Sequence, residues 1–521
     1  MAQVRSGGNS GGMAGSIARA ARAVLCATAL AVGGCGSLGK AVDSVAGPSG
    51  PTNGMPGYVK GFLGSVVADE PSAALVGREV LSAGGTAADA AVAVGFALSV
   101  TLPSRAGLGG GGACLAYGAD RKGPNHGVPE AFLFVPPAPA HPGAGDRPAA
   151  VPLLARGLFL LHSRYGTRQF ESLLGPAEDM ARSGVTVSRS LAHDLSVVAG
   201  PLAADSGARS VFFPAGAPLQ EGQRFVQPGM AATLSQLRRA GVGDLYQGGL
   251  AHVFADSARD AGAALSAEDL RGALPTEVPA LLVPAGTDMV AFLPPPADGG
   301  LAAAAAFNAL RSDPAALDAA GARALAVAAR WRQGGGSPTA VLAAAPGLPA
   351  ATLPPLPASA GFAVLDRNGN AVICALTMNN LFGTGRVAAG TGILLAASPA
   401  VVPPPLLAAA VAYDPRRNAF RAAVTGTGQQ GAALSAAAVM ARALAGAAPY
   451  APPLPAPGRA DVIACTRGLP GDPRSCTWAA DPNGSGLALG QAAGALPPGA
   501  PAAPKPLPDN YAPAPGIPLY R

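Results

Sequence analysis

The sequence predicts a globular α/β protein, because it combines a large apolar fraction with both strand-like and helix-like segments. Its 521 residues are 49% hydrophobic, enough for one large α/β domain or two smaller ones with a sizeable core. Aromatic residues make up only 5%, and alanine dominates the apolar content, which predicts close-packed helices with small side chains. The 71 glycines and 53 prolines predict long irregular connections as well.

The first 34 residues have the layout of an export signal. Arg19 and Arg22 precede the apolar stretch 23–32, and Gly33, Gly34 and Cys35 follow it. This pattern is similar to a bacterial lipoprotein signal, in which the cysteine is lipidated and becomes the mature N-terminus. We therefore expect a periplasmic or cell-surface lipoprotein anchored through Cys35, with a flexible tether over 35–56. The alternative is an ordinary cleaved signal with an incidental cysteine.

The charge balance argues against nucleic-acid binding. The chain has 36 basic and 30 acidic residues, but three of the basic ones, Arg5, Arg19 and Arg22, lie in the acid-free first 34 residues. The remainder therefore carries 33 − 30 = +3, without a basic run that contains interleaved aromatic residues. The apolar stretch at 23–32 is short for a membrane-spanning helix, and no later segment predicts one.

The first elements after the tether are a strand and two helices. Residues 61–68 read as a strand, and Asp69 is placed to cap a helix from Pro71 to about Ser82. Thr86 is placed to cap the next helix, over 87–101. Apolar residues run all round that helix, so it must be buried.

A glycine run, 107–112, comes next and leads into a strand at 113–117. A phosphate-binding loop is excluded there, because no Lys-Ser/Thr pair follows and the next element is a strand. The glycines instead predict a close backbone approach. Residues 121–150 read as loop, and helical spacing then recurs in a series of segments. These segments are 153–165, 170–183, 230–240 and 250–261.

The C-terminal half contains the clearest local pattern. A strand-rich segment begins at Ala280, and 294–300 open an Ala-rich helix, while 333–358 read as exposed and irregular. Two strands, 361–366 and 371–376, then flank Asn368-Gly369, a pair typical of tight hairpin turns.

Six cysteines are present, and export would place four of them in an oxidising compartment once Cys26 and Cys35 are set aside. Cys465 and Cys476 flank a short Gly/Pro-containing segment and are spaced for a disulfide, with two free thiols as the alternative. Cys114 and Cys374 lie in apolar strand-like runs and are expected to be inert core residues. None has zinc-site spacing, and no metal or organic cofactor is predicted.

In order and spacing, segments along nearly the whole mature chain resemble the gamma-glutamyltranspeptidase family. The segments that carry the resemblance are 84–92, 107–112, 164–166, 294–300, 366–372, 382–385, 392–395 and 480–482. The family implies an N-terminal-nucleophile hydrolase fold, a four-layer αββα sandwich. It is made as one precursor that cuts itself before the nucleophile, whose new α-amine accepts the hydroxyl proton. Residues 57–358 then correspond to the large subunit and 359–521 to the small one, intertwined in one domain.

The resemblance assigns three site residues that retain suitable chemistry. Ser359 stands at the nucleophile position, Thr377 where the family hydrogen-bonds the nucleophile, and Asn379 where it contacts substrate. For Ser359 the alternative is a solvated loop residue near Pro354, Pro355 and Pro357. For Thr377 and Asn379 it is a local role at the end of a strand.

Other positions depart from the family. Leu133 stands where an arginine binds the substrate carboxylate, and Val401 where an aspartate pairs with the substrate amine. Leu407-Ala408 replace a Ser-Ser pair, and Gln429-Gln430 replace the Gly-Gly pair of the oxyanion hole, while Gly299 and Gly300 are retained nearby.

A zwitterionic γ-glutamyl group would therefore find neither of its charge partners in this site. We expect its binding free energy to be less favourable by several kcal/mol. The family's reaction is γ-glutamyl transfer or hydrolysis of glutathione-like amides. Three functions stay open: an inactive scaffold or interaction lipoprotein, an amidohydrolase that uses Ser359 on a less polar small amide or peptide, and a transferase with rearranged contacts.

Overall fold

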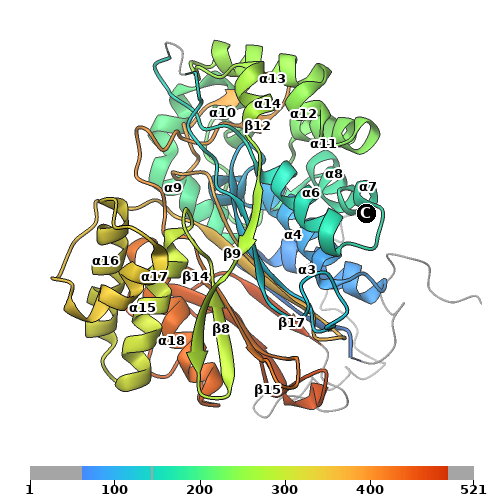
Figure 1. Ribbon diagram of the computed structural model, residues 1–521. Helices are drawn as coiled ribbons and strands as arrows, with labels where there is room; N and C mark the ends of the chain where they lie inside the picture. The colour runs from blue at the N-terminus through green and yellow to red at the C-terminus, as the bar shows by residue number, and fades with distance from the viewer. Residues whose placement is uncertain (1–61, 142–144, 491–521) are drawn as a thin grey trace, which may run out of the picture. The chain divides into compact units, whose positions relative to one another are not determined.

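Two antiparallel β-sheets lie face to face between two groups of helices in the computed structural model, which describes residues 62–141 and 145–490 (Figure 1). One buried cluster contains side chains from both sheets, such as Ala113 and Leu133 from one and Val411 and Ile463 from the other. The chain therefore has the predicted four-layer αββα architecture.

The first sheet has seven strands, and its order mixes segments from both halves of the chain. The order is β17 (Leu487–Gly490), β1 (Gly64–Ala68), β9 (Ala360–Asp366), β10 (Ala371–Thr377), β2 (Gly111–Tyr117), β3 (Glu130–Phe134) and β6 (Thr276–Pro279). The hairpin β9–β10 thus occupies the middle of this sheet, between strands that come from the first third of the sequence.

The second sheet has six strands, and four of them follow residue 359. The order is β16 (Cys476–Ala479), β15 (Arg459–Leu469), β14 (Ala419–Thr427), β13 (Ala408–Asp414), β8 (Asp288–Phe292) and β7 (Leu281–Ala285). Two small ribbons complete the strands: β4 (Val185–Thr186) with β5 (Arg224–Phe225), and β11 (Val387–Ala388) with β12 (Ile393–Leu394).

The helices form two groups, which Figure 1 separates by colour. The blue to green group covers the seven-stranded sheet through α3, α4 and α6, and the yellow to red group packs against the six-stranded sheet. The first group is α3 (Pro71–Ser82), α4 (Ala87–Thr101), α5 (Pro103–Ala106), α6 (Leu154–Tyr165), α7 (Phe170–Leu173), α8 (Gly175–Ser183), α9 (Arg189–Ala204), α10 (Ser206–Phe212), α11 (Pro228–Ala240), α12 (Asp244–Gln247), α13 (Gly249–Asp260) and α14 (Ala267–Gly272). The second is α15 (Asp298–Ser312), α16 (Leu317–Arg332), α17 (Pro338–Ala344) and α18 (Ala432–Leu444).

Local signals in the sequence specify several of these elements. Helix α4 is buried along its whole length, and Thr86 and Asp89 form a capping box at its start, as its apolar residues and the position of Thr86 predicted. The hairpin strands are confirmed, with Gly369 at φ +89° in the turn between them. Both signals depend on neighbouring residues alone.

Several predictions about single elements were wrong. The cap of α3 is Glu70, whose carboxylate accepts from the Ala73 N–H at 2.9 Å, and Asp69 instead accepts from Gly361 on β9. The segments predicted to be irregular contain β3 and α17, and the helix predicted over 170–183 is interrupted at Leu174. Some of these differences have a local origin, because Ser337 caps α17 with Pro338 in its first turn, and Pro176 lies in the first turn of α8.

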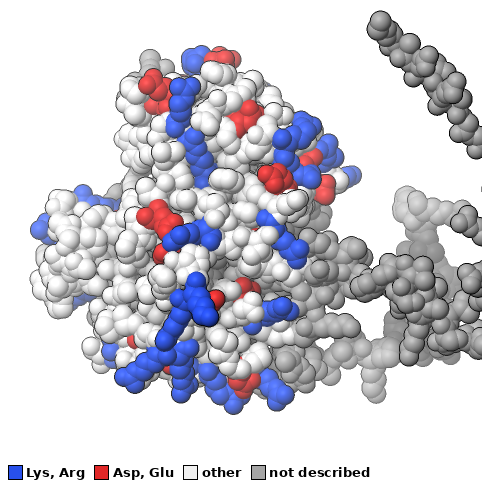
Figure 2. Space-filling model, turned by 45° about the vertical axis from the view of Figure 1, so that its right-hand side comes forward, with Lys and Arg blue, Asp and Glu red and all other residues white. Residues whose placement is uncertain are grey.

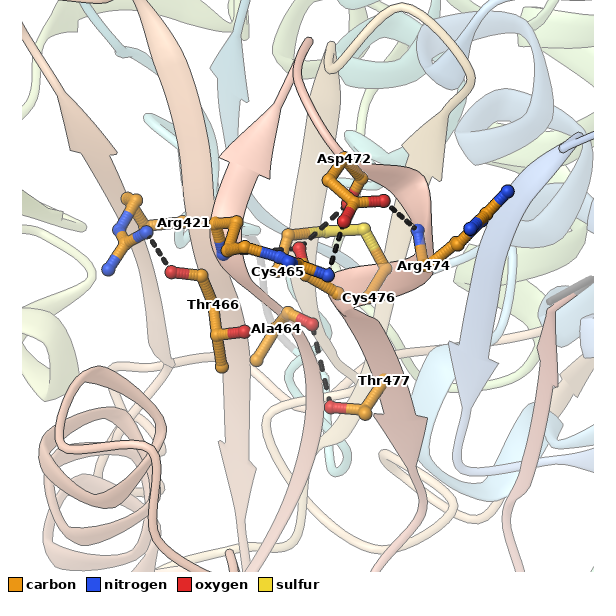
Figure 3. The surroundings of a disulfide bond; sticks show 10 residues. Arg421, Ala464, Cys465, Thr466, Asp472, Arg474, Cys476 and Thr477 are labelled. Carbon is orange, nitrogen blue, oxygen red and sulfur yellow. Dashed lines mark hydrogen bonds and ion pairs between the residues drawn. A yellow bond between two sulfur atoms is a disulfide. The ribbon is translucent and has the colours of Figure 1, made fainter. Parts of the chain in front are cut away.

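The cysteines form two disulfides. Cys465 is joined to Cys476 across β15 and β16, beside hydrogen bonds from Arg421 to Thr466 O and from Thr477 to Ala464 O (Figure 3). Cys114 and Cys374 are also joined, at directly paired positions of β2 and β10. The prediction that this second pair would be inert core residues was wrong, because strands 260 residues apart in sequence are neighbours in the sheet.

The predicted signal over 1–34, the lipidation site Cys35 and the tether at 35–56 lie outside the described residues. Within 62–141 and 145–490, no helix is long and apolar enough to cross a membrane. Figure 2 shows one face on which basic and acidic side chains are interspersed among many uncharged residues.

Candidate active site

Ser359 lies at the end of the sandwich where β9 begins and β10 ends. In the hairpin, Ala360 pairs with Leu376, so Ser359 and Thr377 are the next residues on the two adjacent strands. The side chain of Ser359 is not solvated, because the residue is only 2% exposed. The alternative of an exposed loop serine was therefore wrong.

Thr377 and Asn379 both make local hydrogen bonds at the strand end. The Thr377 hydroxyl accepts from the Asn379 N–H at 2.8 Å. Asn379 has φ +55°, and its Nδ2 donates to Pro136 O at 3.1 Å and to Ala397 O at 3.0 Å. Its Oδ1 is buried and has no hydrogen-bond partner in the part of the chain that the structure describes. Asn379 therefore has a structural role and also leaves one acceptor unused.

Gly361 allows the two sheets to approach each other beside Ser359. A Cβ atom at this position would lie 2.3 Å from Oγ1 of Thr425 on β14, a separation that real side chains do not adopt. The Thr425 hydroxyl itself donates to Cys374 O on β10 at 3.4 Å. A side chain at position 361 therefore has no room unless Thr425 is displaced.

Three aspartates, of which Asp461 and Asp481 are buried and Asp69 is half-buried, lie at this end of the sandwich, and the sequence analysis did not assign any of them to the site. Asp69, which follows β1, accepts from the Gly361 N–H at 2.7 Å. Asp461 on β15 accepts through Oδ1 from the Asp481 N–H at 3.0 Å, and Asp481 accepts from the Ala460 N–H at 3.1 Å. A strand-to-helix Asp-Glu pair at 69–70 was the only signal available, and it was interpreted as a helix cap.

The carboxyl groups of Asp69 and Asp461 influence each other's protonation. Burial raises the pKa of Asp69, which the hydrogen bond from Gly361 and the charges of Arg105 and Arg459 only partly offset. Burial and then the negative charge of Asp69 raise the pKa of Asp461 well above its ordinary value. The Oδ2 atom of Asp461 is buried with no partner among the described residues. Both carboxyl groups therefore have a raised pKa, and that of Asp461 is raised strongly.

The family's charged positions are apolar or displaced in this structure. Leu133 points into the buried cluster between the sheets, and Leu407 and Ala408 are buried. Val401, by contrast, is 59% exposed. These positions therefore supply neither a cation for a carboxylate nor an anion for an amine.

Gln429 and Gln430 form a 3₁₀ turn between β14 and α18. Gln429 is exposed with φ +55°, and Gln430 is half-buried. No hydrogen bond joins either side chain to Ser359 or Thr377 in the described structure. The sequence placed these residues in the oxyanion neighbourhood, and that role stays a prediction.

Gly299 and Gly300 lie in the first turn of α15 and have a packing role. A Cβ atom would lie 2.5 Å from Leu407 O at Gly299 and 2.2 Å from Leu293 O at Gly300. Their absence of side chains lets α15 begin directly against the ends of β8 and β13.

Comparison with known proteins identifies the family. The sequence model of gamma-glutamyltranspeptidase matches residues 73–330. The chain belongs to the gamma-glutamyltranspeptidase family. Its gamma-glutamyltranspeptidase relatives include the glutathione hydrolase proenzyme of Bacillus subtilis strain 168, 31% identical over 252 residues, which are 46% of this chain and 43% of the relative. That of Escherichia coli strain K12 is 28% identical over 389 residues, 65% of this chain and 66% of the relative.

A solved structure extends the similarity of fold beyond these matches. Cephalosporin acylase from Bacillus halodurans superimposes with a TM-score of 0.67 over 83% of this chain and 96% of its own, at 18% identity. The matched region spans less than half the length of the first of these gamma-glutamyltranspeptidase relatives. The family and the fold are thus shared. Among the described residues, no group of three or more His, Cys, Asp or Glu side chains is arranged to hold a metal ion.

Proposed function

We propose that this protein is an exported lipoprotein of the gamma-glutamyltranspeptidase family whose altered site no longer carries out γ-glutamyl transfer or hydrolysis, and that it acts as a scaffold or interaction protein. The observation that carries the proposal is the charge at the Ser359 end of the sandwich. Leu133 stands in the apolar core where the family has its carboxylate-binding arginine, while Asp69, Asp461 and Asp481 cluster beside Gly361.

This arrangement of charges is unfavourable for binding of the family's substrate. A γ-glutamyl group would bring its carboxylate close to Asp69, Asp461 and Asp481, and the position matched to the family's arginine is occupied by Leu133. Burying a charge without a partner costs several kcal/mol, which corresponds to a loss of affinity on the order of a thousandfold. Arg105, one of the two arginines that act on Asp69, does not compensate, because it already forms an ion pair with Asp194 at 2.5 Å.

A second candidate function is hydrolysis of a less polar amide by Ser359. The buried and unpartnered Oδ1 of Asn379 favours it, because a substrate N–H could use that acceptor. Ser359 and Thr377 also lie on adjacent strand ends, as a nucleophile and its hydroxyl partner would.

A chromogenic assay separates the two functions. We expect purified protein to release no measurable anilide from γ-glutamyl anilide or from a matched series of neutral acyl anilides, with the same background in Ser359→Ala. Release that disappears in Ser359→Ala would overturn the proposal. Turnover of the neutral substrates alone would favour the amidohydrolase, and turnover of the γ-glutamyl substrate would restore the family's activity.

The membrane anchor is a separate part of the proposal and rests on Gly33-Gly34-Cys35 after an Arg-flanked apolar stretch. We expect the wild-type protein to sediment with membranes and Cys35→Ala to move to the soluble fraction. Cys26→Ala, a cysteine inside the apolar stretch, is the matched control and should behave as wild type. If wild type and Cys35→Ala are released equally, Cys35 is not the anchor.

A further inference from the structure

A cavity of about 420 Å³ lies among the helices that pack against the six-stranded sheet, lined by segments remote in sequence from Ser359. It is formed by the C-terminal ends of α15 and α18, the start of α16 and the loop around 451–452. Its walls are mainly apolar and include Phe307, Leu310, Leu317 and Leu444. A cavity of this size and lining is typical of a small-molecule site.

Two arginines, Arg311 and Arg442, supply the positive charge of this cavity, and none of the residues that line it is acidic. Nη1 of Arg311 donates to Pro284 O at 2.5 Å, and Nη1 of Arg442 donates to Pro449 O at 2.9 Å. Nη2 of Arg442 is buried and has no hydrogen-bond partner among the described residues. Two of the terminal nitrogens of Arg442 thus differ, because Nη1 is hydrogen-bonded to the backbone and Nη2 is enclosed by the protein.

The surroundings of Arg442 favour an anionic partner. Burial lowers the pKa of its guanidinium, and no neighbouring acid opposes that effect. Arg311 and Arg442 make the lining positively charged, so an anion in the cavity would gain an electrostatic attraction that a neutral ligand would not. An inorganic anion would leave the apolar walls uncovered, whereas an anion with an alkyl chain would cover them as well.

We propose that this cavity binds an unbranched alkyl monocarboxylate, with its carboxylate against Arg442 and its chain along Phe307, Leu310 and Leu444. The occupant belongs to the chemical class of medium-chain fatty acids. This site is independent of the proposed function, because its residues belong to the outer ends of helices and do not include the Ser359 end of the sandwich.

Calorimetric titration of the intact protein with octanoate, decanoate and decanol tests the site. We expect each added methylene to tighten carboxylate binding roughly fourfold, because each buries additional apolar area. Decanoate should bind on the order of tenfold or more tightly than decanol, because only the carboxylate pairs with Arg442. Equal binding of decanoate and decanol, or no binding of either, would overturn the proposal.

Four variants locate the ligand. Arg442→Met should weaken decanoate binding on the order of tenfold or more and leave decanol unchanged, while the exposed α16 variant Arg330→Met should match wild type. Ala441→Phe, which fills the cavity from a half-buried position on α18, should weaken both ligands. Ser359→Ala should bind decanoate as wild type does. Retained decanoate binding in a folded Arg442→Met or Ala441→Phe protein would place the ligand elsewhere and refute the site.

Discussion

Replacement of both Cys114 and Cys374 by alanine is expected to lower the free energy of unfolding by about 5 kcal/mol. The bond joins β2 to β10 in the middle of the seven-stranded sheet, and the two residues are 260 positions apart. A disulfide that closes so long a loop removes much conformational entropy from the unfolded chain. Denaturant unfolding under non-reducing conditions measures the effect.

The second disulfide provides a matched control. Cys465 and Cys476 are only 11 positions apart. Replacement of both by alanine should therefore lower the free energy of unfolding by only about 3 kcal/mol. Both double variants remove one bond and two sulfur atoms, and they differ mainly in loop length. If the free energy of unfolding falls less for the Cys114/Cys374 variant than for the Cys465/Cys476 variant, the result contradicts a disulfide between β2 and β10. Alkylation of Cys114 and Cys374 in unreduced, denatured wild type would show that the bond is absent.

The variant Asp461→Asn is expected to raise the free energy of unfolding at pH 8 by about 2 kcal/mol. In the wild type, Asp461 is buried beside Asp69, and its Oδ2 lacks a partner among the described residues. An asparagine keeps an oxygen for the Asp481 N–H, adds a donor and removes one negative charge. The gain therefore comes from relief of burial and repulsion, with little change in side-chain volume.

The pH dependence of this effect has a definite sign. The pKa of Asp461 is raised in the folded protein, so the folded state holds the proton more tightly than the unfolded state does. Stability is then greatest below the unfolded pKa, about 3.9, and is lost as the pH rises through the folded value. The difference between Asp461→Asn and wild type should grow over this interval. Asp260→Asn, on the exposed end of α13, should show no such growth, and a constant difference for Asp461→Asn would refute the interaction.

Sequence reasoning succeeded where the determining contacts are local. The β9–β10 hairpin follows from Asn368-Gly369 between two apolar runs, and α4 follows from Thr86 and a helix without a polar face. The order of the landmark segments in the sequence was enough to predict the family. The family in turn predicted the four-layer fold.

The candidate site depended on contacts that local patterns do not contain. Cys114 meets Cys374 only because β2 pairs with β10 in one register, and Asp69 interacts with Asp461 only because β1 and β15 belong to facing sheets. The burial of Ser359 next to Gly361 likewise requires the close approach of Thr425 from the other sheet. A segment that contains Pro354, Pro355 and Pro357 gave no sign of this.

The intact mass of the purified mature protein under denaturing conditions tests the central claim most directly. Self-cleavage before Ser359 would require a hydroxyl aimed at Ala358 C=O and donors for the resulting oxyanion. Here Thr425 leaves no space for a side chain at Gly361, and Gln429 and Gln430, which the sequence analysis matched to the oxyanion glycines, lie in the turn after β14. We predict one unbroken chain across the Ala358–Ser359 bond. Two fragments that meet at this bond in wild type, and a single chain in Ser359→Ala, would contradict the proposed loss of activity.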